Sequence, residues 1–165
     1  MVGGVRLVWS VWGDDVIDRE LLRFSDRAVS DMTPAYVAVV HDIKQATAEQ
    51  FESEGQRAGE KWAELAPSTV AAKEAAGYEP GTILRATNLL FESLTEDEHE
   101  DQVMIIEGGN LTFGSNVYYG KFHKTGTVNM PARDPLEFTE LDKVGWMKQL
   151  QRYIATGELG PGAVI

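Results

Sequence analysis

The sequence predicts an α+β fold: a small antiparallel β-sheet packed against two to four helices, with a long N-terminal helix and a C-terminal helix. Apolar residues recur at helical spacing in several segments, of which 34–51 is the longest. The segment 102–115 combines alternating apolar residues with central glycines, which is typical of a β-hairpin. A chain of 165 residues, 43% of them hydrophobic, is enough for a single domain with a sizeable core, so we assign 1–165 to one domain.

The first 30 residues are predicted to form an N-terminal extension, whose role the sequence leaves open. Residues 5–12, VRLVWSVW, are β-branched and aromatic, which predicts a strand. A helical stripe follows, formed by Ile17, Leu21, Phe24 and Ala28. The extension lacks the features of a signal peptide, and no segment approaches the ~18 apolar residues that span a bilayer.

The next segment is expected to form the longest helix. Thr33 and Pro34 predict its start, because threonine caps helices and proline suits the first helical position. The helix is expected to end near Glu54. Its apolar face comprises Tyr36, Val40, Ile43, Thr47 and Phe51, and we expect all but the threonine to be buried.

Residues 55–82 are expected to be irregular, since glycines and prolines recur throughout. Within them we predict a short helix over 68–76, capped by Ser68 or Thr69. A further helix is predicted over 82–94, with one row formed by Leu84, Asn88, Phe91 and Leu94.

The acidic run 96–101 is expected to be a solvated turn, because the alternating ligands and glycine bend of a calcium loop are absent. Residues 102–107 and 111–115 predict the two strands of a hairpin, joined by a turn at 108–110. Residues 117–124 are expected to form a short helix or turn.

The C-terminal part is predicted to contain an extended segment over 131–138 and a last helix. Thr139 would cap this helix, with Asp142 at the capping-box position, and Gly157 would end it. Residues 156–165 are expected to be a flexible tail. The apolar face of the helix would consist of Leu141, Val144, Met147, Leu150 and Ile154.

Composition excludes several classes of function. The chain has no cysteine, which rules out a disulfide framework, a thiolate metal site and a thiol-based enzyme. Its net charge of −11 argues against binding of duplex DNA, because such binding needs a basic face that displaces counterions. The charge serves solubility, or it forms an acidic surface to which nearby DNA does not adhere.

Sequence motifs for catalysis and for cofactors are missing. We find no glycine-rich phosphate loop, no G-x-S-x-G elbow, and no metal-binding spacing among His41, His99 and His123. We therefore predict no catalytic, metal-binding or cofactor-binding residue, and no cofactor. His123 is either a general base beside Tyr119 or Lys124, or a partly buried histidine whose ring donates to a backbone carbonyl. The second interpretation is favoured because no nucleophile is indicated.

Two blocks of sequence resemble one known family. The first comprises WAELAPST at 62–69, then Lys73 and Gly77, then ILRATNLLFESL at 83–94. The second comprises YYGKFHKTG at 118–126, followed by MPAR at 130–133. In order and spacing they resemble the phage virion morphogenesis or tail-completion family, which includes the Mu and P2 types and neck proteins of siphophages.

The resemblance covers about residues 51–155, so the first 30 residues lie beyond the pattern. Asn88 stands where the family usually has glycine, and Gly120 where it usually has alanine. The resemblance gives a structural or interface role to eleven residues: Trp62, Leu65, Thr69, Leu84, Thr87, Leu90, Tyr118, His123, Gly126, Pro131 and Arg133. From its setting alone, Trp62 is expected to plug the core beneath a loop.

The resemblance implies a non-enzymatic virion protein at the neck, or head-proximal end of the tail, of a long-tailed phage, assembled in the host cytoplasm. Its partners would be further copies of itself, in a ring that is commonly hexameric, and neighbouring neck or tail proteins. DNA would pass nearby without being specifically bound, and no membrane would be involved. Tail completion, tail termination and head–tail connection are not separated, nor are the ring stoichiometry and the lumen-facing residues known.

Two alternatives from other classes stay open at this stage. One is a small acidic binding module, or a DNA mimic that inhibits a basic host protein. The other is a small hydrolase that uses His123. We further expect residues 130–135 to be extended and close to a subunit or partner boundary, with Arg133 in an ion pair or bonded to backbone carbonyls. The competing interpretation is that Arg133 serves only the internal fold.

Overall fold

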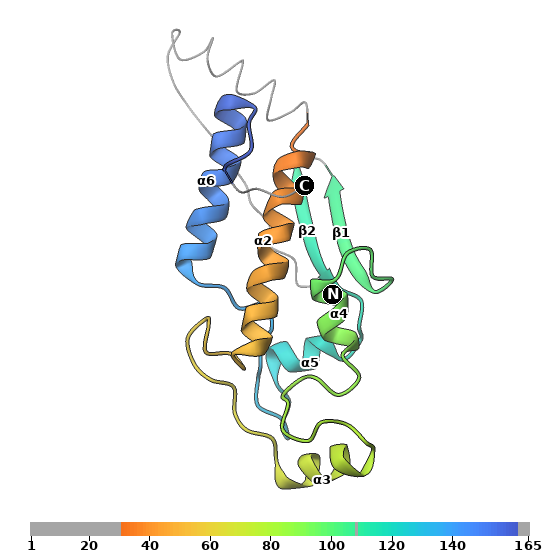
Figure 1. Cartoon of the computed structure of the whole chain (residues 1–165). Coiled ribbons are helices and arrows are strands. Elements are labelled where there is room, and N and C mark those ends of the chain that lie inside the picture. The colour runs from red at the N-terminus through yellow and green to blue at the C-terminus, as the bar shows by residue number, and fades with distance from the viewer. Residues whose placement is uncertain (1–30, 108, 162–165) are drawn as a thin grey trace. The chain divides into compact units, whose positions relative to one another are not determined.

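The computed structural model describes residues 31–107 and 109–161 (Figure 1). The strand predicted at 5–12 and the helical stripe at 17–28 lie outside the described residues, as do Gly108 and residues 162–165 of the predicted tail. Five helices and a two-stranded antiparallel sheet make up the regular structure of the described part. The predicted α+β fold class is therefore confirmed.

The chain divides into two compact units. Of the described residues, the first contains Lys44–Val103 and Gly114–Thr139, and the second contains 31–43, 104–107, 109–113 and 140–161. Helix α2 (Thr33–Glu52) and strands β1 (Gln102–Glu107) and β2 (Asn110–Ser115) each contribute residues to both units. The assignment of 1–165 to a single domain stays a prediction.

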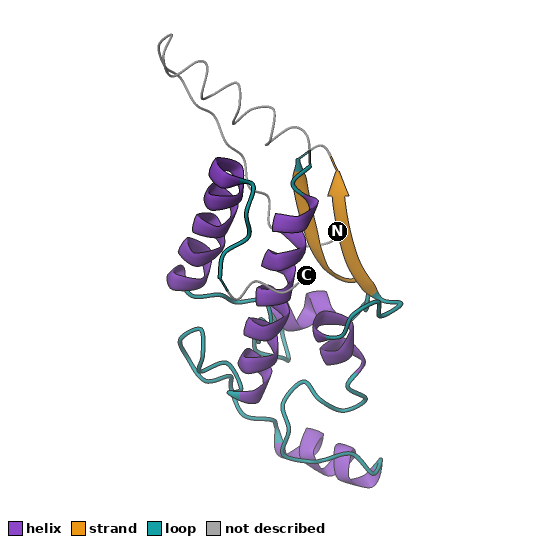
Figure 2. Ribbon diagram, turned by 45° about the horizontal axis from the view of Figure 1, so that its top comes forward, coloured by secondary structure: helices purple, strands orange, loops and turns teal. Residues whose placement is uncertain are grey.

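In the second unit, the first half of α2 lies between helix α6 (Glu140–Thr156) and the strand pair (Figures 1 and 2). Tyr36 donates a hydrogen bond from its hydroxyl to the carbonyl of Gly109, at 2.6 Å, and so ties α2 to the hairpin. The Gln149 amide donates to the Asp42 carboxylate, also at 2.6 Å, and so ties α6 to α2. These polar contacts flank a core whose α2 residues include Ala35, Tyr36, Val39, Val40 and Ile43.

The predicted long helix is confirmed, and so is its buried face. Tyr36, Val40, Ile43 and Phe51 are all buried, and Thr47 beside them has no exposed surface. The helix ends at Glu52, two residues earlier than expected.

The apolar face predicted for the last helix is wrong for Leu141, Val144 and Met147 and correct for Leu150. Leu141 is 83% exposed, Val144 45% and Met147 37%, whereas Trp146 and Leu150 are buried. Burying the indole of Trp146 removes more apolar surface from water than any aliphatic residue of the helix would, so it sets the helix rotation. The predicted end is correct: Gly157 has a left-handed φ of 75° and donates its N–H to the Tyr153 carbonyl.

In the first unit, three aromatic rings pack around the C-terminal half of α2. Phe51 meets Trp62 edge-on at 5.7 Å between ring centroids, and meets Phe91 in the same manner at 5.2 Å. Leu90 and Leu94 of helix α4 (Leu89–Thr95) are buried as well. Helix α3 (Pro67–Ala75) and helix α5 (Gly120–Thr125) complete this unit.

The helix predicted over 82–94 is wrong in its first half, since α4 begins only at Leu89. Leu84 and Asn88 have left-handed φ values of 58° and 59°, which interrupt a right-handed helix. The expected cap of α3 is also wrong: Ala66 holds the cap position and no side chain caps the helix. Pro67 begins the helix and has no N–H to satisfy, which reduces the need for a cap.

Three further local predictions agree with the structure. The acidic run is a turn, the hairpin forms from β1 and β2, and the short helix α5 follows. β2 begins at Asn110, which was expected to belong to the turn. In the segment expected to be extended, residues 135 and 136 instead make a turn. None of the described helices has the length and apolar character needed to cross a membrane.

Candidate functional site

Seven of the eleven motif residues line one hollow of about 500 Å³ in the first unit. Three segments that are distant in sequence meet there, namely 64–69 with α3, 82–87, and 119–133. The seven lining motif residues are Leu65, Thr69, Leu84, Thr87, His123, Pro131 and Arg133. The family resemblance therefore marked residues that the fold brings together.

Arg133 joins two of these segments. Its side chain is buried, and the guanidinium donates from Nε to the Ala63 carbonyl at 2.9 Å and from Nη2 to the Glu64 carbonyl at 3.0 Å. Its backbone N–H donates to the His123 carbonyl at 2.6 Å. Burial lowers the pKa of Arg133, yet a guanidinium stays charged at neutral pH. The expected bonding to backbone carbonyls is confirmed, and the acceptors belong to the same chain.

Lys73 joins the segment that contains α3 to the segment 82–87 in a similar way. It is buried on α3, and its ammonium donates to the carbonyl and hydroxyl of Thr82 at 2.5 and 3.0 Å, and to the Arg85 carbonyl at 3.5 Å. Burial lowers the pKa of Lys73, and the charge of Glu79 opposes this shift. Lys73 belongs to the first family block, but a single lysine in a short helix gives no sequence signal of burial, so its role was missed.

The segment 82–88 is held in an irregular conformation by local contacts. The Thr82 hydroxyl bonds to the carbonyls of Glu79 and Arg85, and the Arg85 guanidinium lies 4.1 Å from the centre of the Phe91 ring. Asn88 occupies the left-handed position just before α4. Both glycine and asparagine tolerate this conformation, which explains why asparagine can replace the usual family glycine.

His123 is half-buried at the side of the hollow. Its ring packs edge-on against Tyr119 at 5.7 Å, and its Nδ1 is buried without a hydrogen-bond partner. Burial lowers the pKa of His123, and the positive charge of Arg133 lowers it further. The predicted bond to a backbone carbonyl is therefore not made at Nδ1. Lys124, one of the two neighbours considered for a general-base arrangement, instead pairs with Asp134 at 3.4 Å.

Gly126 closes the loop that carries Met130 and Pro131 to the hollow. Its φ is 69°, and a Cβ at this position would lie 2.8 Å from the Ala132 nitrogen and 2.9 Å from the Met130 oxygen. Both contacts are with backbone, so a side chain would force the loop apart.

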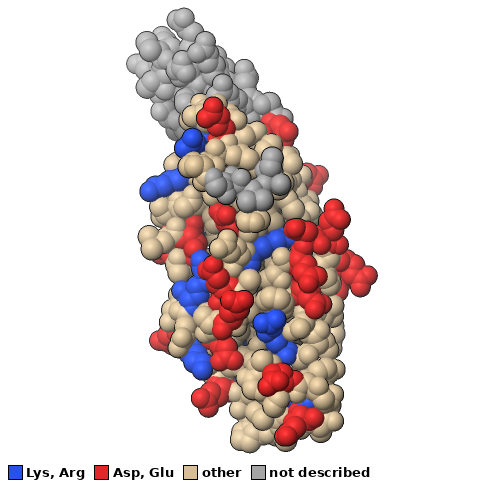
Figure 3. All heavy atoms as spheres, in the orientation of Figure 1, with Lys and Arg blue, Asp and Glu red and all other residues tan. Residues whose placement is uncertain are grey.

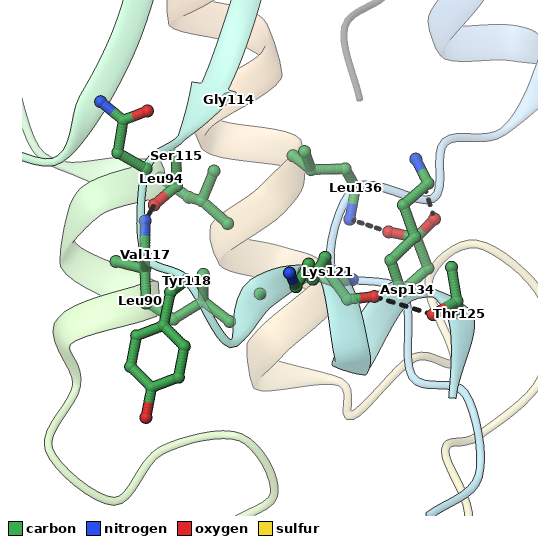
Figure 4. A pocket seen from close by; sticks show the side chains of 14 residues that line it. Leu90, Leu94, Gly114, Ser115, Val117, Tyr118, Lys121, Thr125, Asp134 and Leu136 are labelled. Carbon is green, nitrogen blue, oxygen red and sulfur yellow. Dashed lines mark hydrogen bonds and ion pairs between the residues drawn. The ribbon is translucent and has the colours of Figure 1, made fainter. Parts of the chain in front are cut away.

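Trp62, Leu90 and Tyr118 are the other motif residues outside the hollow. Trp62 is buried against Phe51, and its indole covers Gly55, as expected of a core plug. Leu90 and Tyr118 line a second hollow of about 420 Å³ beside α5 (Figure 4). Leu90 is buried there, whereas Tyr118 is 78% exposed.

The chemical capacity of the first hollow follows from these contacts. Its two buried cations, Arg133 and Lys73, already bond to carbonyls of the chain itself. Among residues 31–107 and 109–161, no cluster of three or more histidine, aspartate or glutamate side chains is arranged to hold a metal ion. The arrangement fixes three segments of the chain against one another.

Comparison with known proteins matches the chain to a family model. The model of the phage virion morphogenesis family matches residues 14–154, which is most of the chain. The match begins well before residue 51, so residues 14–30 belong to the family region and the expectation that they lie beyond it is corrected. No curated protein and no solved structure matches the chain.

Proposed function

Because this chain belongs to the phage virion morphogenesis family, and is thus a bacteriophage protein of virion structure and assembly, we propose that it forms a ring at the neck. In this proposal the ring lies at the head-proximal end of a long tail, has six copies as the expected number, and joins the tail to the head. The protein has no catalytic step of its own and acts through contacts with its own copies and neighbouring virion proteins.

The proposal is supported by the contacts that the motif residues make within the chain. Arg133 and Lys73 bond to carbonyls of their own chain, and Gly126 permits a close backbone approach. These are roles in holding a shape, which is what a subunit of a rigid ring needs. The half-buried His123 has a lowered pKa and is favoured neutral, next to an aromatic ring.

The charge of the chain supports a place beside DNA. A net charge of −11 repels the phosphate backbone, so DNA can move past the ring without adhering to it. Acidic side chains predominate on the face that Figure 3 presents, with basic ones among them.

Deletion of the gene from the phage tests the proposal. Electron micrographs of the lysate should show heads and tails that are not joined, and a plasmid copy of the wild-type gene should restore joined particles. Gold label on a tagged chain should lie at the head–tail junction. Joined, infectious particles without the gene, or label elsewhere on the virion, would refute the proposal.

The same micrographs distinguish the three roles at the neck. Loss of a tail-completion protein should leave filled heads and tails of normal length. Loss of a terminator should give tails of irregular length, because polymerisation is no longer stopped. Loss of a connector should give heads that have lost DNA.

A further inference from the structure

Exposed apolar side chains gather on the segment around α5. Tyr118 is 78% exposed, Phe122 41% and Val128 is fully exposed, although all three lie within eleven consecutive positions. Exposed aromatic residues that gather in this way mark surfaces that bind other proteins, and tyrosine is enriched among the residues that dominate such interfaces.

The same segment lies in the longest stretch of the chain that lacks acidic residues. No aspartate or glutamate occurs from 108 to 133, although the chain has 26 of them. Lys121 lies on α5 with its ammonium 4.9 Å from the centre of the Phe122 ring. We call Tyr118, Lys121, Phe122 and Val128 the aromatic–basic patch. Tyr118 and Lys121 also line the second hollow, which gives the patch a recess (Figure 4).

A surface of opposite charge lies on the same unit. The turn 96–101 contains five acidic residues, and Glu96, Asp97, Glu98 and Glu100 are exposed. The side chain of Asp97 stays 93% exposed even though it pairs with Lys44. We call residues 96–101 the acidic turn.

Resting on the ring proposed above, we propose that the aromatic–basic patch of one copy docks onto the acidic turn of the next copy. Tyr118 and Phe122 are the apolar anchors, and Lys121 faces Glu98 and Glu100. Two copies that each carry a net charge of −11 repel one another, so their association needs a local pairing of opposite charges. The acid-free stretch supplies one half of this pairing and the acidic turn supplies the other.

The charged residues and the aromatic residues of this contact have different roles, as in protein interfaces generally. Charge complementarity steers the approach and fixes the register of two surfaces, whereas buried aromatic anchors supply most of the affinity. A ring needs two different surfaces on each subunit that fit one another, and a patch and a turn of opposite character meet that need.

Charge reversal with rescue tests this contact. Lys121→Glu alters the patch, and Glu98→Lys with Glu100→Lys alters the turn. Lys148→Glu, at an exposed lysine of α6, is the matched control. Assembly is measured by mass photometry and sedimentation of the purified chain and its virions, and by the titre of a deletion phage complemented with each variant. All sites are exposed, so the variants should melt like wild type.

Each reversal alone should lower the assembled fraction about tenfold, and the control should not. Combining both reversals in one chain, or mixing the two variants, should restore assembly because opposite charges again face each other. Tyr118→Ala should weaken assembly without being rescued by any charge change. High salt should weaken wild-type assembly.

Three results would overturn the contact. Reversals without effect on wild-type rings would place the interface elsewhere and leave the ring intact. Reversals that impair assembly but do not rescue one another would show that the patch binds a different acidic protein. A wild-type chain that is monomeric both in solution and in virions would refute the ring itself.

Discussion

Replacement of Arg133 by alanine should destabilise the chain by about 2–4 kcal/mol. The substitution removes two charge-assisted hydrogen bonds, to the carbonyls of Ala63 and Glu64, each contributing about 1.5–3 kcal/mol when the acceptors become unpaired. Ala63 and Glu64 are themselves exposed, so water can replace part of what is lost, which favours the lower end. Relief of the cost of burying a charge offsets a further part.

The variant should be measured by urea denaturation, with tryptophan fluorescence and circular dichroism recorded together. Trp62 lies beside the two acceptor carbonyls, so its fluorescence reports on the affected region. Arg133→Lys keeps the charge but lacks the fork of donors, and should lose about half as much free energy. Arg152→Ala removes an exposed arginine from α6 and should change stability by less than about 0.5 kcal/mol.

A particular pair of results would refute this reasoning. If Arg133→Ala unfolds within about 0.5 kcal/mol of wild type, the two carbonyl contacts do not hold the segments together. If this variant nevertheless fails to join heads to tails, Arg133 acts at a boundary with a partner. That outcome would agree with the sequence prediction that residues 130–135 lie close to a subunit or partner boundary.

Three further predictions test other parts of the fold. Ile43→Asp should cost several kcal/mol, on the order of 4, and lower the soluble yield, because it puts a charge in the core, whereas Gln45→Asp on the exposed side should be nearly neutral. Gly126→Ala should lower the free energy of unfolding by at least ~2 kcal/mol more than Gly77→Ala, since both sites have positive φ but only Gly126 faces backbone atoms within 3 Å. Because the pKa of His123 is lowered in the folded state, the unfolded chain binds a proton more readily, so stability should fall as pH drops through ~6.5. Urea titrations from pH 8 to 5 check this: His123→Gln should flatten the pH dependence, and an unchanged slope would count against it.

Local sequence rules predicted the elements whose burial follows from periodicity alone. The stripe from Tyr36 to Phe51 has a single apolar face, and the helix has no other way to bury it. The hairpin likewise follows from its central glycines and alternating strands. Both depend on interactions between residues close in sequence.

Errors arose where tertiary contacts choose between local options. In α6, a row of Leu141, Val144 and Met147 competes with Trp146 and Leu150, and only packing decides which face is buried. Over residues 82–88 a helix is locally plausible. The left-handed backbone of Leu84 and Asn88, and the use of the Thr82 carbonyl by Lys73, interrupt it.

Local sequence rules also could not predict that the motif residues lie close together in space. Spacing along the chain says nothing about which segments meet, so the contact from Arg133 to residues 63 and 64, across about seventy positions, has no local signal. The family resemblance supplied the names of the residues, and the structure supplied their geometry.

The short helix α5 connects the internal contacts of Arg133 to the proposed contact surface. Its His123 carbonyl accepts the Arg133 N–H on one side, while Lys121 and Phe122 are exposed. Loss of the Arg133 contacts should therefore displace the aromatic–basic patch and weaken assembly indirectly. Stability separates the two effects, because Arg133→Ala should lower both stability and assembly, whereas Lys121→Glu should lower assembly alone. A single preparation of each variant, measured for unfolding and for ring formation, distinguishes a residue that shapes the surface from a residue that makes the contact.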